Sequence, residues 1–564
     1  MKKTNKLYTP EYEHLDAAKP LSNYPYPQFK RNSYISLNGI WKHKVSKDKN
    51  DLSSIDEDIL VPYPIESIAS KVNKKLNKGE YIIYKKIFKL PSNFLKKNTF
   101  IHFLGVDQEF DVIINGYRFK DLVTLNMPIK LDISKYVKDK NELIVIVKDD
   151  IDIKYPTGKQ SKKPKGIFYT PFSGIYYPVF IESLDDEYIN EIKIKTNLNT
   201  LNLSINSTSN NFEITIKEKE KIIVHEYINS KEFTYTFENP INWTTENPFL
   251  YDLEIKTKTD TISSYFGLRE ITMKDGFVYL NNKKVFLNGV LDQGYYPEGL
   301  VTPSSFETIK KDVLFVKELG FNTIRKHIKV ELPHFYYYCD KYGLLVFQDF
   351  VNNGKYSFFK DTALPTLGFQ TKKDQKMHAY FEQRHNFIKG GEKLISYLTN
   401  YVSIAGYTIF NEGWGQFDSN NVYHHFKNKY PSILFDATSG WYRVSDSDFN
   451  SYHWYFKNLE KLKTIDEPIF LSEFGALCYK VKGHSYGNRN VFGYTYFKDE
   501  EELEKQIIDL FENKIIPYKD KLVGTIFTQL SDIEEEDNGL ITYDRKYVKF
   551  DKNVVKKLLN NLSK

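Results

Sequence analysis

The sequence predicts a multidomain protein in which two antiparallel β-sandwiches precede a C-terminal (β/α)8 TIM barrel. The chain has 564 residues, which is too many for one hydrophobic core. Its first half alternates short apolar strands with turn signals, whereas its second half alternates strands with segments of helical period. The predicted boundaries are 1–183 and 184–273 for the sandwiches and 274–564 for the barrel.

The composition is that of an ordinary globular protein, apart from an aromatic content of 16%. The 79 Lys and Arg against 73 Asp and Glu give a net charge of +6 that is spread along the chain. Without a long basic run, the charge does not predict a nucleic-acid partner. The two cysteines, Cys339 and Cys478, make no disulfide framework, and we expect them to be buried free thiols.

The N-terminal segment MKKTNKLYTPEYEHLDAAKP contains lysines but no apolar stretch after them, so it does not resemble a signal peptide. No run in the chain approaches the roughly 20 apolar residues of a membrane span. These features predict a soluble, cytoplasmic protein without a membrane partner. They leave open whether it is a homo-oligomer.

The first zone alternates apolar and polar residues with period 2, which is typical of half-buried strands. Asn-Gly pairs at 38–39 and 115–116 indicate tight hairpins. A basic loop, TGKQSKKPKG (157–166), interrupts this zone. We interpret it as a solvated excursion, with a loop that reaches over a neighbouring domain's pocket as the alternative. The strands on which the interpretation rests are 81–90, 99–106, 110–116 and 142–149.

The second zone, 184–273, contains six or seven further strands with the spacing of a small sandwich. No reactive side chains cluster in it, so we interpret it as a structural spacer.

The third zone contains eight apolar strands with helical patterns between several of them, which predicts a TIM barrel. Ser304 or Ser305 is expected to cap the first helix, and Gly320 to end it. The predicted strands are 285–290, 321–327, 344–350, 404–412, 433–440, 449–455, 468–474 and 522–529. The predicted helices are 304–320, 331–343, 374–399, 501–516 and 553–564.

Charged and polar side chains occur at or near the carboxyl ends of these strands, where TIM barrels place their chemistry. Burying such groups there costs free energy unless they have hydrogen-bond or ion-pair partners, or serve a function. In chain order they are Asp292, His327, Asp349, Asn411, Glu412, Asp436, His453 and Glu473.

Glu412 and Glu473 are the candidate catalytic residues, at the ends of predicted strands 4 and 7. These strands face each other across the barrel mouth, so the two carboxylates are expected to meet over one pocket. Cleavage of a glycosidic bond needs such a pair, one carboxyl to protonate the leaving oxygen and one to attack the anomeric carbon or activate water. The alternative is that both are ion-pair partners of nearby Arg or Lys.

In these motifs the chain resembles glycoside hydrolase family 2, the family of β-galactosidases, β-glucuronidases and β-mannosidases. The resemblance covers nearly the full length and implies a jelly-roll sugar-binding-like domain, an immunoglobulin-like domain and a catalytic barrel. The motifs that carry it are YPYPQFKR (24–31), SLNGIW (36–41), FDVIING (110–116), FSGIYYPVFIE (172–182), WTTENPFLYDLEI (243–255), FGLREI (266–271), FNTIRKH (321–327), FNEGWGQF (410–417), LSEFGA (471–476) and TQLSDIEEEDNGLITYDRK (528–546).

The resemblance implies that Glu412 is the general acid/base and Glu473 the nucleophile of a configuration-retaining reaction, with Asn411 bound to the sugar 2-hydroxyl. Two departures bear on the substrate. The strand-1 segment reads GVLDQGYYPEG (289–299) in place of a His-Glu-rich motif, and the segment after strand 8 is dominated by acids that would repel a uronate. A neutral sugar is therefore favoured.

The remaining candidates for substrate binding are Asp292, His327, Asp349, His453, Trp414 and Trp454, with Trp454 as a stacking surface for an apolar sugar face. Asp349 is equally well explained as a partner of Arg325 or Lys326. The adjacent histidines of HHFKNK (424–429) point in different directions on a helix and make no metal site. We predict no metal and no cofactor.

The function predicted from these observations is that of a retaining exo-β-glycosidase acting on carbohydrate. Two alternatives remain, a catalytically degenerate carbohydrate-binding protein and a β-glucuronidase or another specificity of the same family.

Overall fold

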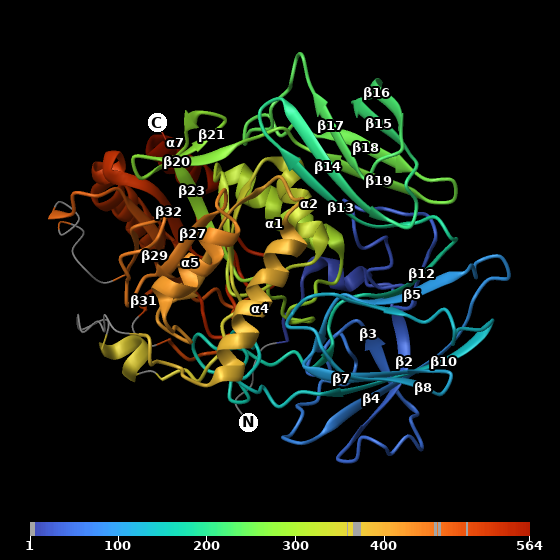
Figure 1. Cartoon of the computed structure of the whole chain (residues 1–564). Helices are drawn as coiled ribbons and strands as arrows, with labels where there is room; N and C mark the ends of the chain where they lie inside the picture. The colour runs from blue at the N-terminus through green and yellow to red at the C-terminus, as the bar shows by residue number, and fades with distance from the viewer. Residues whose placement is uncertain are drawn as a thin grey trace.

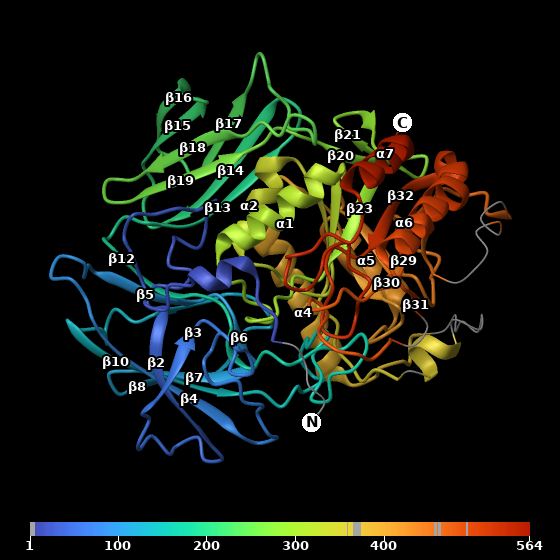
Figure 2. The same cartoon turned by 180° about the vertical axis from the view of Figure 1, so that it is seen from behind.

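The computed structural model describes residues 6–357, 359–364, 374–455, 460, 464–491 and 494–563. It has three parts, and each of them contacts the other two (Figures 1 and 2). Among the described residues, no helix combines the length and the apolar character that a membrane crossing requires.

The first part is a sandwich of two antiparallel sheets, which buries Trp41, Tyr84 and Val145 in its core. A short 3-10 helix, Pro10–His14, precedes it. One sheet has the order β1 (Tyr34–Ser36), β12 (Val179–Leu184), β5 (Asn98–Phe103) and β9 (Ile129–Asp132). The other has the order β3 (Glu57–Val61), β2 (Gly39–Ser46), β4 (Tyr81–Lys89), β10 (Lys140–Lys148), β7 (Glu109–Ile114) and β8 (Tyr117–Val123). Two short strands, β6 (Val106–Asp107) and β11 (Gly174–Ile175), pair beside them.

The second part is a smaller antiparallel sandwich with its own core, which includes Ile192, Leu203 and Ile214. Its seven strands agree with the six or seven predicted. One sheet contains β13 (Ile189–Thr196), β14 (Thr200–Ser207) and β17 (Glu232–Thr236). The other contains β16 (Lys221–Ile228), β15 (Phe212–Glu218), β18 (Tyr251–Lys256) and β19 (Thr261–Phe266).

A meander of three short strands closes the end of the barrel opposite the functional residues. Its Val278 and Leu280 pack with Leu287, Leu345 and other residues near the starts of barrel strands. The sequence prediction did not include this element. Its strands are β20 (Ile271–Lys274), β21 (Phe277–Leu280) and β22 (Lys283–Lys284).

The third part is the predicted parallel barrel of eight strands. Ladders connect the strands in the order β27-β26-β25-β24-β23-β32-β29-β28, so the barrel is open only between β27 and β28. In chain order the strands are β23 (Leu287–Asp292), β24 (Thr323–Lys326), β25 (Leu345–Asp349), β26 (Ile404–Asn411), β27 (Leu434–Ser439), β28 (Ser451–Trp454), β29 (Ile469–Gly475) and β32 (Leu522–Thr528).

Helices cover the outside of the barrel as predicted (Figure 1). Ser305, not Ser304, caps α1 by accepting a hydrogen bond from the Glu307 N–H, and Gly320 ends the helix with φ of 97°. The helices are α1 (Phe306–Leu319), α2 (Pro333–Tyr342), α4 (Phe381–Leu398), α5 (Ser419–Lys429), α6 (Glu500–Asp509) and α7 (Lys552–Ser563). A π-turn (Phe359–Ala363) precedes α4, π and 3-10 turns (Leu510–Ile515, Ile516–Lys521) follow α6, and β30 (Leu477–Tyr479) pairs with β31 (Thr495–Phe497).

The connection between β27 and β28 departs from the regular succession of strand and helix. The connection 440–450 between β27 and β28 is fully described and contains no helix. Its sequence, GWYRVSDSDFN, has no apolar repeat of helical period, and the missing ladder lies at this point of the barrel.

The basic loop 157–166 is not the solvated excursion that we favoured from the sequence. The N–H groups of Thr157 and Gly158 donate to the Asn352 carbonyl beyond β25, at 3.1 and 3.0 Å. The Gly166 N–H donates to Glu535 beyond β32 at 3.1 Å. This loop of the first part therefore lies against the carboxyl-end loops of the barrel, which is the contact that the alternative interpretation requires.

The two cysteines are buried and free, as predicted. Burial raises the pKa of both thiols, which keeps them protonated and unreactive.

Candidate active site

Glu412 follows directly on β26, in a backbone conformation that turns its side chain into the barrel mouth. Its φ is 52°, and its N–H donates to the Ser439 carbonyl at the end of β27 with a distance of 2.9 Å. The Glu412 side chain is 23% exposed, whereas those of His453 and Glu473 are 0% and 5% exposed. It can therefore meet both a bound molecule and solvent.

Glu473, near the end of β29, is buried with a side chain 5% exposed. Arg325 donates to its Oε1 at 3.1 Å, and the Tyr455 hydroxyl donates to its Oε2. Burial alone would raise the pKa of this carboxyl, but the charges of His453 and Arg325 and the Tyr455 hydrogen bond lower it to about 2. Glu473 is therefore an anion throughout the physiological pH range.

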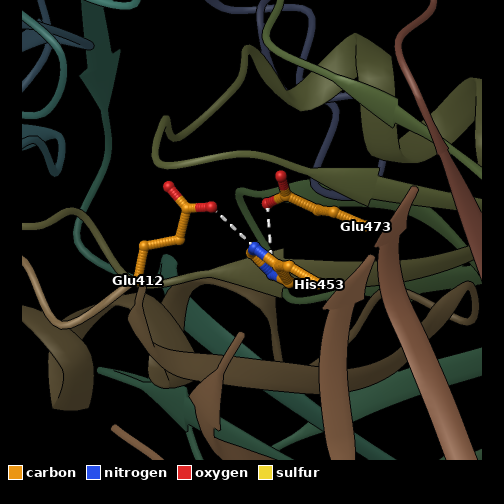
Figure 3. A group of neighbouring side chains, drawn as sticks. All are labelled: Glu412, His453 and Glu473. Atoms are coloured by element: carbon orange, nitrogen blue, oxygen red, sulfur yellow. Dashed lines mark hydrogen bonds and ion pairs between the residues drawn. The ribbon is translucent and has the colours of Figure 1, made fainter. Parts of the chain in front are cut away.

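His453, on β28, lies between the two glutamates (Figure 3). Its Nδ1 is 2.7 Å from Glu412 Oε1, and its Nε2 is 3.5 Å from Glu473 Oε1. One oxygen of each carboxylate and a ring nitrogen of His453 all lie within 4.8 Å of one another. Strands β26 and β29 therefore bring the two glutamates close together.

Arg325, on β24, connects this group to the barrel interior and is completely buried. It donates two hydrogen bonds to the Asp349 carboxylate, at 2.9 and 3.1 Å. The same guanidinium donates to Glu473 and, at 2.9 Å, to Asn411 Oδ1. The single positive charge of Arg325 is therefore shared between the Asp349 and Glu473 carboxylates.

Three further predicted residues lie in the same group. Asn411 is oriented by Arg325, and no described residue accepts a hydrogen bond from its Nδ2. His327 Nδ1 is 2.6 Å from Asp349 Oδ2 and 4.0 Å from Glu473 Oε1. Asp349 is held by Arg325 and His327, which is the ion-pair alternative considered for it.

Asp292 lies apart from the two glutamates, in a buried cluster of its own. Its Oδ2 accepts from Lys326 Nζ at 2.7 Å, and its Oδ1 accepts from the Gly294 N–H at 2.8 Å. Lys326 donates to Glu331 as well, at 3.0 Å. With both oxygens engaged, Asp292 is better placed to hold the strand-1 loop than to bind a sugar.

The two predicted tryptophans contact described residues other than Glu412 and Glu473. Trp414 is buried, donates from Nε1 to the Gly354 carbonyl at 2.9 Å, and packs at 81° against Phe168 with ring centres 5.1 Å apart. Phe168 belongs to the segment that follows the basic loop of the first part. Trp454 is 9% exposed and lies beside Tyr452.

Sequence reasoning missed three residues of the site. Tyr455 contacts Glu473, the Trp441 ring lies 5.7 Å from His453, and Ser439 Oγ is 2.9 Å from His453 Nε2. All three follow or end barrel strands, so the strand-end rule that selected the glutamates could have found them.

Lys159, from the basic loop, adds a positive charge on this side of the barrel. Its Nζ lies 5.7 Å from the centre of the Tyr169 ring, and no described carboxylate pairs with it. Burial and the Lys159 charge together lower the pKa of His327. The first part of the chain therefore contributes to the electrostatics of the candidate site.

Two family models match the chain. Residues 179–269 match the family model "Glycosyl hydrolases family 2", and residues 271–558 match "Glycosyl hydrolases family 2, TIM barrel domain". The chain is 28% identical over 333 residues to a β-galactosidase of Staphylococcus xylosus, across 56% of this chain and 31% of that protein. It is 29% identical over 353 residues to a β-galactosidase of Thermoanaerobacterium thermosulfurigenes, across 56% and 48%.

The aligned regions thus span less than half of either curated relative. Among solved structures, a β-D-glucuronidase of Dictyoglomus thermophilum superposes with a TM-score of 0.73 at 19% identity, over 96% of this chain and 98% of that one. This similarity concerns the fold, which is shared over nearly the full length.

Proposed function

Because the chain belongs to glycosyl hydrolase family 2, we propose that it is a retaining exo-β-glycosidase with Glu473 as nucleophile and Glu412 as general acid/base. The observation that carries this proposal is the approach of the two carboxylates, whose oxygens lie within 4.8 Å of each other. Carboxyl groups of retaining enzymes are about 5–5.5 Å apart, whereas inverting enzymes leave about 6.5–9.5 Å for a water molecule.

The environments of the two glutamates support different roles for them. Glu473 is buried and anionic, and Arg325 and Tyr455 hold it in one orientation, as a nucleophile requires. Glu412 is more exposed and contacts His453, so it can exchange a proton with a leaving group and then with water. Two carboxyl groups in different environments, each with its own role, are typical of glycosidases.

The proposed reaction has two displacements. Glu412 protonates the glycosidic oxygen while Glu473 attacks the anomeric carbon, which forms a glycosyl-enzyme. Glu412 then takes a proton from a water molecule that attacks the same carbon and releases Glu473. Asn411, whose amide nitrogen is available, is proposed to bind the sugar 2-hydroxyl.

We also propose that 1–183, 184–273 and 274–564 are separate domains. Each of the two sandwiches has a hydrophobic cluster of its own, which supports this division.

The stereochemistry of the product tests the mechanism. We expect an aryl β-glycoside to release the β-anomer of the free sugar first, because two inversions restore the configuration. Proton NMR within the first minutes of hydrolysis, before mutarotation, reads the anomer directly. Initial release of the α-anomer would contradict the assignment of Glu473 as nucleophile. Sugar binding without turnover of any aryl glycoside would favour the degenerate carbohydrate-binding alternative.

The proposed substrate is a neutral sugar, as the acidic segment after β32 suggests. Glu535 of this segment pairs with Arg489 at 3.1 Å, and Glu536 accepts from the Tyr169 and Tyr494 hydroxyls. Burial raises the pKa of Glu534 to about 7. Local partners and burial therefore reduce the repulsion of a uronate that we expected from these acids.

A β-glucuronidase is the second candidate, and the unpaired Lys159 ammonium is the observation that favours it. A panel of aryl glycosides that includes galactoside, glucoside, mannoside, glucuronide and galacturonide decides between the candidates. If the glucuronide is the best substrate, we expect Lys159→Met to lower its kcat/KM by about 10–100-fold, the value of one charge-assisted hydrogen bond. On a neutral glycoside the same variant should stay within about threefold of the wild type. Equal losses on both substrates would show that Lys159 only supports the loop.

A further inference from the structure

A groove lies outside the barrel, along the side of α4 that borders the first part of the chain (Figure 1). It consists of two adjoining cavities with volumes of about 490 and 430 Å³, which share the lining residues Ile129 and Lys393. None of the described residues that line it belongs to the group around Glu412 and Glu473. The groove is therefore separate from the candidate active site.

Hydrogen bonds between the three parts of the chain fix the walls of this groove. In the first cavity, Asn386 Nδ2 of α4 donates to the Lys154 carbonyl of the first part at 2.9 Å. In the second cavity, the Asn400 side chain accepts from the Ile194 N–H at 2.9 Å and donates to the Ile192 carbonyl at 2.8 Å. The groove is thus formed before any ligand arrives, as small-molecule sites usually are.

Three lysines line the groove near the point where the two cavities meet, and none of them forms an ion pair with a described carboxylate. Lys389 and Lys393 are four residues apart on α4, where like charges repel each other and destabilise the helix. Burial and the Lys389 charge lower the pKa of Lys393. Lys130, on β9, has its Nζ 3.9 Å from the centre of the Phe100 ring. Positive charge without an ion-pair partner among the described residues therefore gathers at this point.

The acidic side chains of the groove lie away from that point or have partners of their own. Glu182, in the second cavity, accepts from the Tyr24 hydroxyl at 2.6 Å and pairs with Arg31 at 3.4 Å. An anionic group is therefore best accommodated where the two cavities meet. The other acids each line only one of the two cavities and are Asp121, Glu382 and Glu191.

Aromatic rings give the groove surfaces that suit the apolar faces of sugars. Phe381, at the start of α4, is 76% exposed. Tyr26, Tyr397 and Tyr401 line the second cavity, and their hydroxyls make no hydrogen bond to a described residue. Such a ring can pack on a sugar while its hydroxyl binds a sugar hydroxyl. Rings and ammonium groups together favour a ligand that is both a carbohydrate and an anion.

We propose that this groove is a second carbohydrate-binding site, which takes a sugar chain that carries a carboxylate or sulfate group. The anionic group binds at Lys130, Lys389 and Lys393, and the neighbouring sugar rings lie against the aromatic side chains of the two cavities. Binding there relieves the repulsion between the lysines of α4. It requires neither Glu412 nor Glu473, so it does not depend on the proposed reaction.

Isothermal titration calorimetry of the full-length protein tests this proposal with four probes. A galacturonate trisaccharide carries carboxylates, a κ-carrageenan oligosaccharide carries sulfates, maltotriose is uncharged, and a short oligothymidylate is an anion without sugar faces exposed for stacking. We expect at least one anionic saccharide to bind with a Kd of about 1 mM or below, and maltotriose to bind at least about tenfold more weakly. The double variant Lys389→Met/Lys393→Met should weaken the anionic saccharide by about tenfold, the value of a charge-assisted hydrogen bond.

Lys556→Met/Lys557→Met is the matched control, because it removes two exposed lysines from another helix, α7, outside the groove. Its Kd should stay within about twofold of the wild type, since only general charge is lost. Glu473→Gln should also keep its Kd within about twofold, because the groove lies outside the active site. No binding of either anionic saccharide, equal losses in the two double variants, or loss of binding in Glu473→Gln would overturn the proposal. Oligothymidylate that binds as tightly as the saccharides would do so as well.

Tyr397→Phe measures the contribution of the rings separately from that of the charges. Removal of this hydroxyl leaves no described residue without a hydrogen-bond partner, so the fold should persist, which thermal unfolding checks. We expect the anionic saccharide to bind about threefold more weakly, the value of one neutral hydrogen bond. An unchanged Kd in Tyr397→Phe would show that the lysines bind an anion of any kind, and would overturn the assignment to carbohydrate.

Discussion

Replacing Glu473 by glutamine is expected to lower kcat on every aryl β-glycoside by roughly 10⁴–10⁶-fold, as losses of catalytic nucleophiles generally do. An amide oxygen still accepts a hydrogen bond from Arg325, but it does not form the glycosyl ester on which the second displacement acts. The change keeps the size of the side chain, so the fold should persist, which circular dichroism and thermal unfolding check. Steady-state kinetics with the best substrate of the panel measure the loss.

Glu298→Gln provides the control for that experiment. Glu298 is also a buried carboxylate of the barrel part, where it joins Thr9 to Ser304 and lies outside the group around Glu473. We expect its kcat to remain within about threefold of the wild type, because substitutions away from the site act on stability rather than chemistry. Similar kcat losses in both variants would point to a general effect of removing buried charge.

A mechanism-based label identifies the nucleophile independently of mutation. A 2-deoxy-2-fluoro aryl glycoside slows both displacements, so the glycosyl-enzyme accumulates. Mass spectrometry of the digested protein should place the added sugar on the peptide that contains Glu473. A label on the peptide that contains Glu412 would exchange the two roles.

The sequence predicted the barrel and its two glutamates because the relevant signals are local. Eight apolar strands are visible as runs of β-forming residues, and the fold itself gathers whatever stands at their carboxyl ends. Glu412 and Glu473 therefore come together without any knowledge of side-chain packing. The missing helix after β27 is equally local, because 440–450 has no apolar repeat of helical period.

The remainder of the site depends on contacts between distant segments, which no local pattern encodes. In the sequence, Arg325 is recognisable only as a charged residue near the end of a strand. In the structure it is fully buried and binds groups from four other strands. Asp292 is likewise a charged residue near a strand end in the sequence, but in the structure it accepts a hydrogen bond from Lys326, in a separate buried cluster. In the sequence, the basic loop 157–166 looks like a solvated segment, because its charged residues can be recognised there. The barrel residues that bind its backbone cannot be recognised from the sequence.

The second large effect is expected at Arg325, which balances two buried carboxylates. Arg325→Met leaves Asp349 and Glu473 without their shared cation and should lower the free energy of unfolding by about 3–5 kcal/mol at pH 7, the cost of breaking a buried ion pair. Activity should fall with it, because Glu473 and Asn411 lose the group that orients them. Arg325→Lys keeps the charge but not the forked donors, so we expect an intermediate stability and still a low kcat.

The pH dependence of that loss separates charge from packing. The folded pKa of Glu473, about 2, lies below its ordinary value of 4.5, so this carboxylate stabilises the native state above pH 4.5 and ceases to do so as the pH falls toward 2. Without Arg325 that contribution shrinks. The difference in unfolding free energy between wild type and Arg325→Met should therefore be largest near pH 7 and smaller at pH 4. Urea unfolding at both pH values measures this difference.

Arg118→Met, which removes a partly exposed ion pair with Asp111, should lower the free energy of unfolding by less than about 1 kcal/mol. A difference for Arg325→Met that is equally large at pH 4 and pH 7 would assign its role to packing alone.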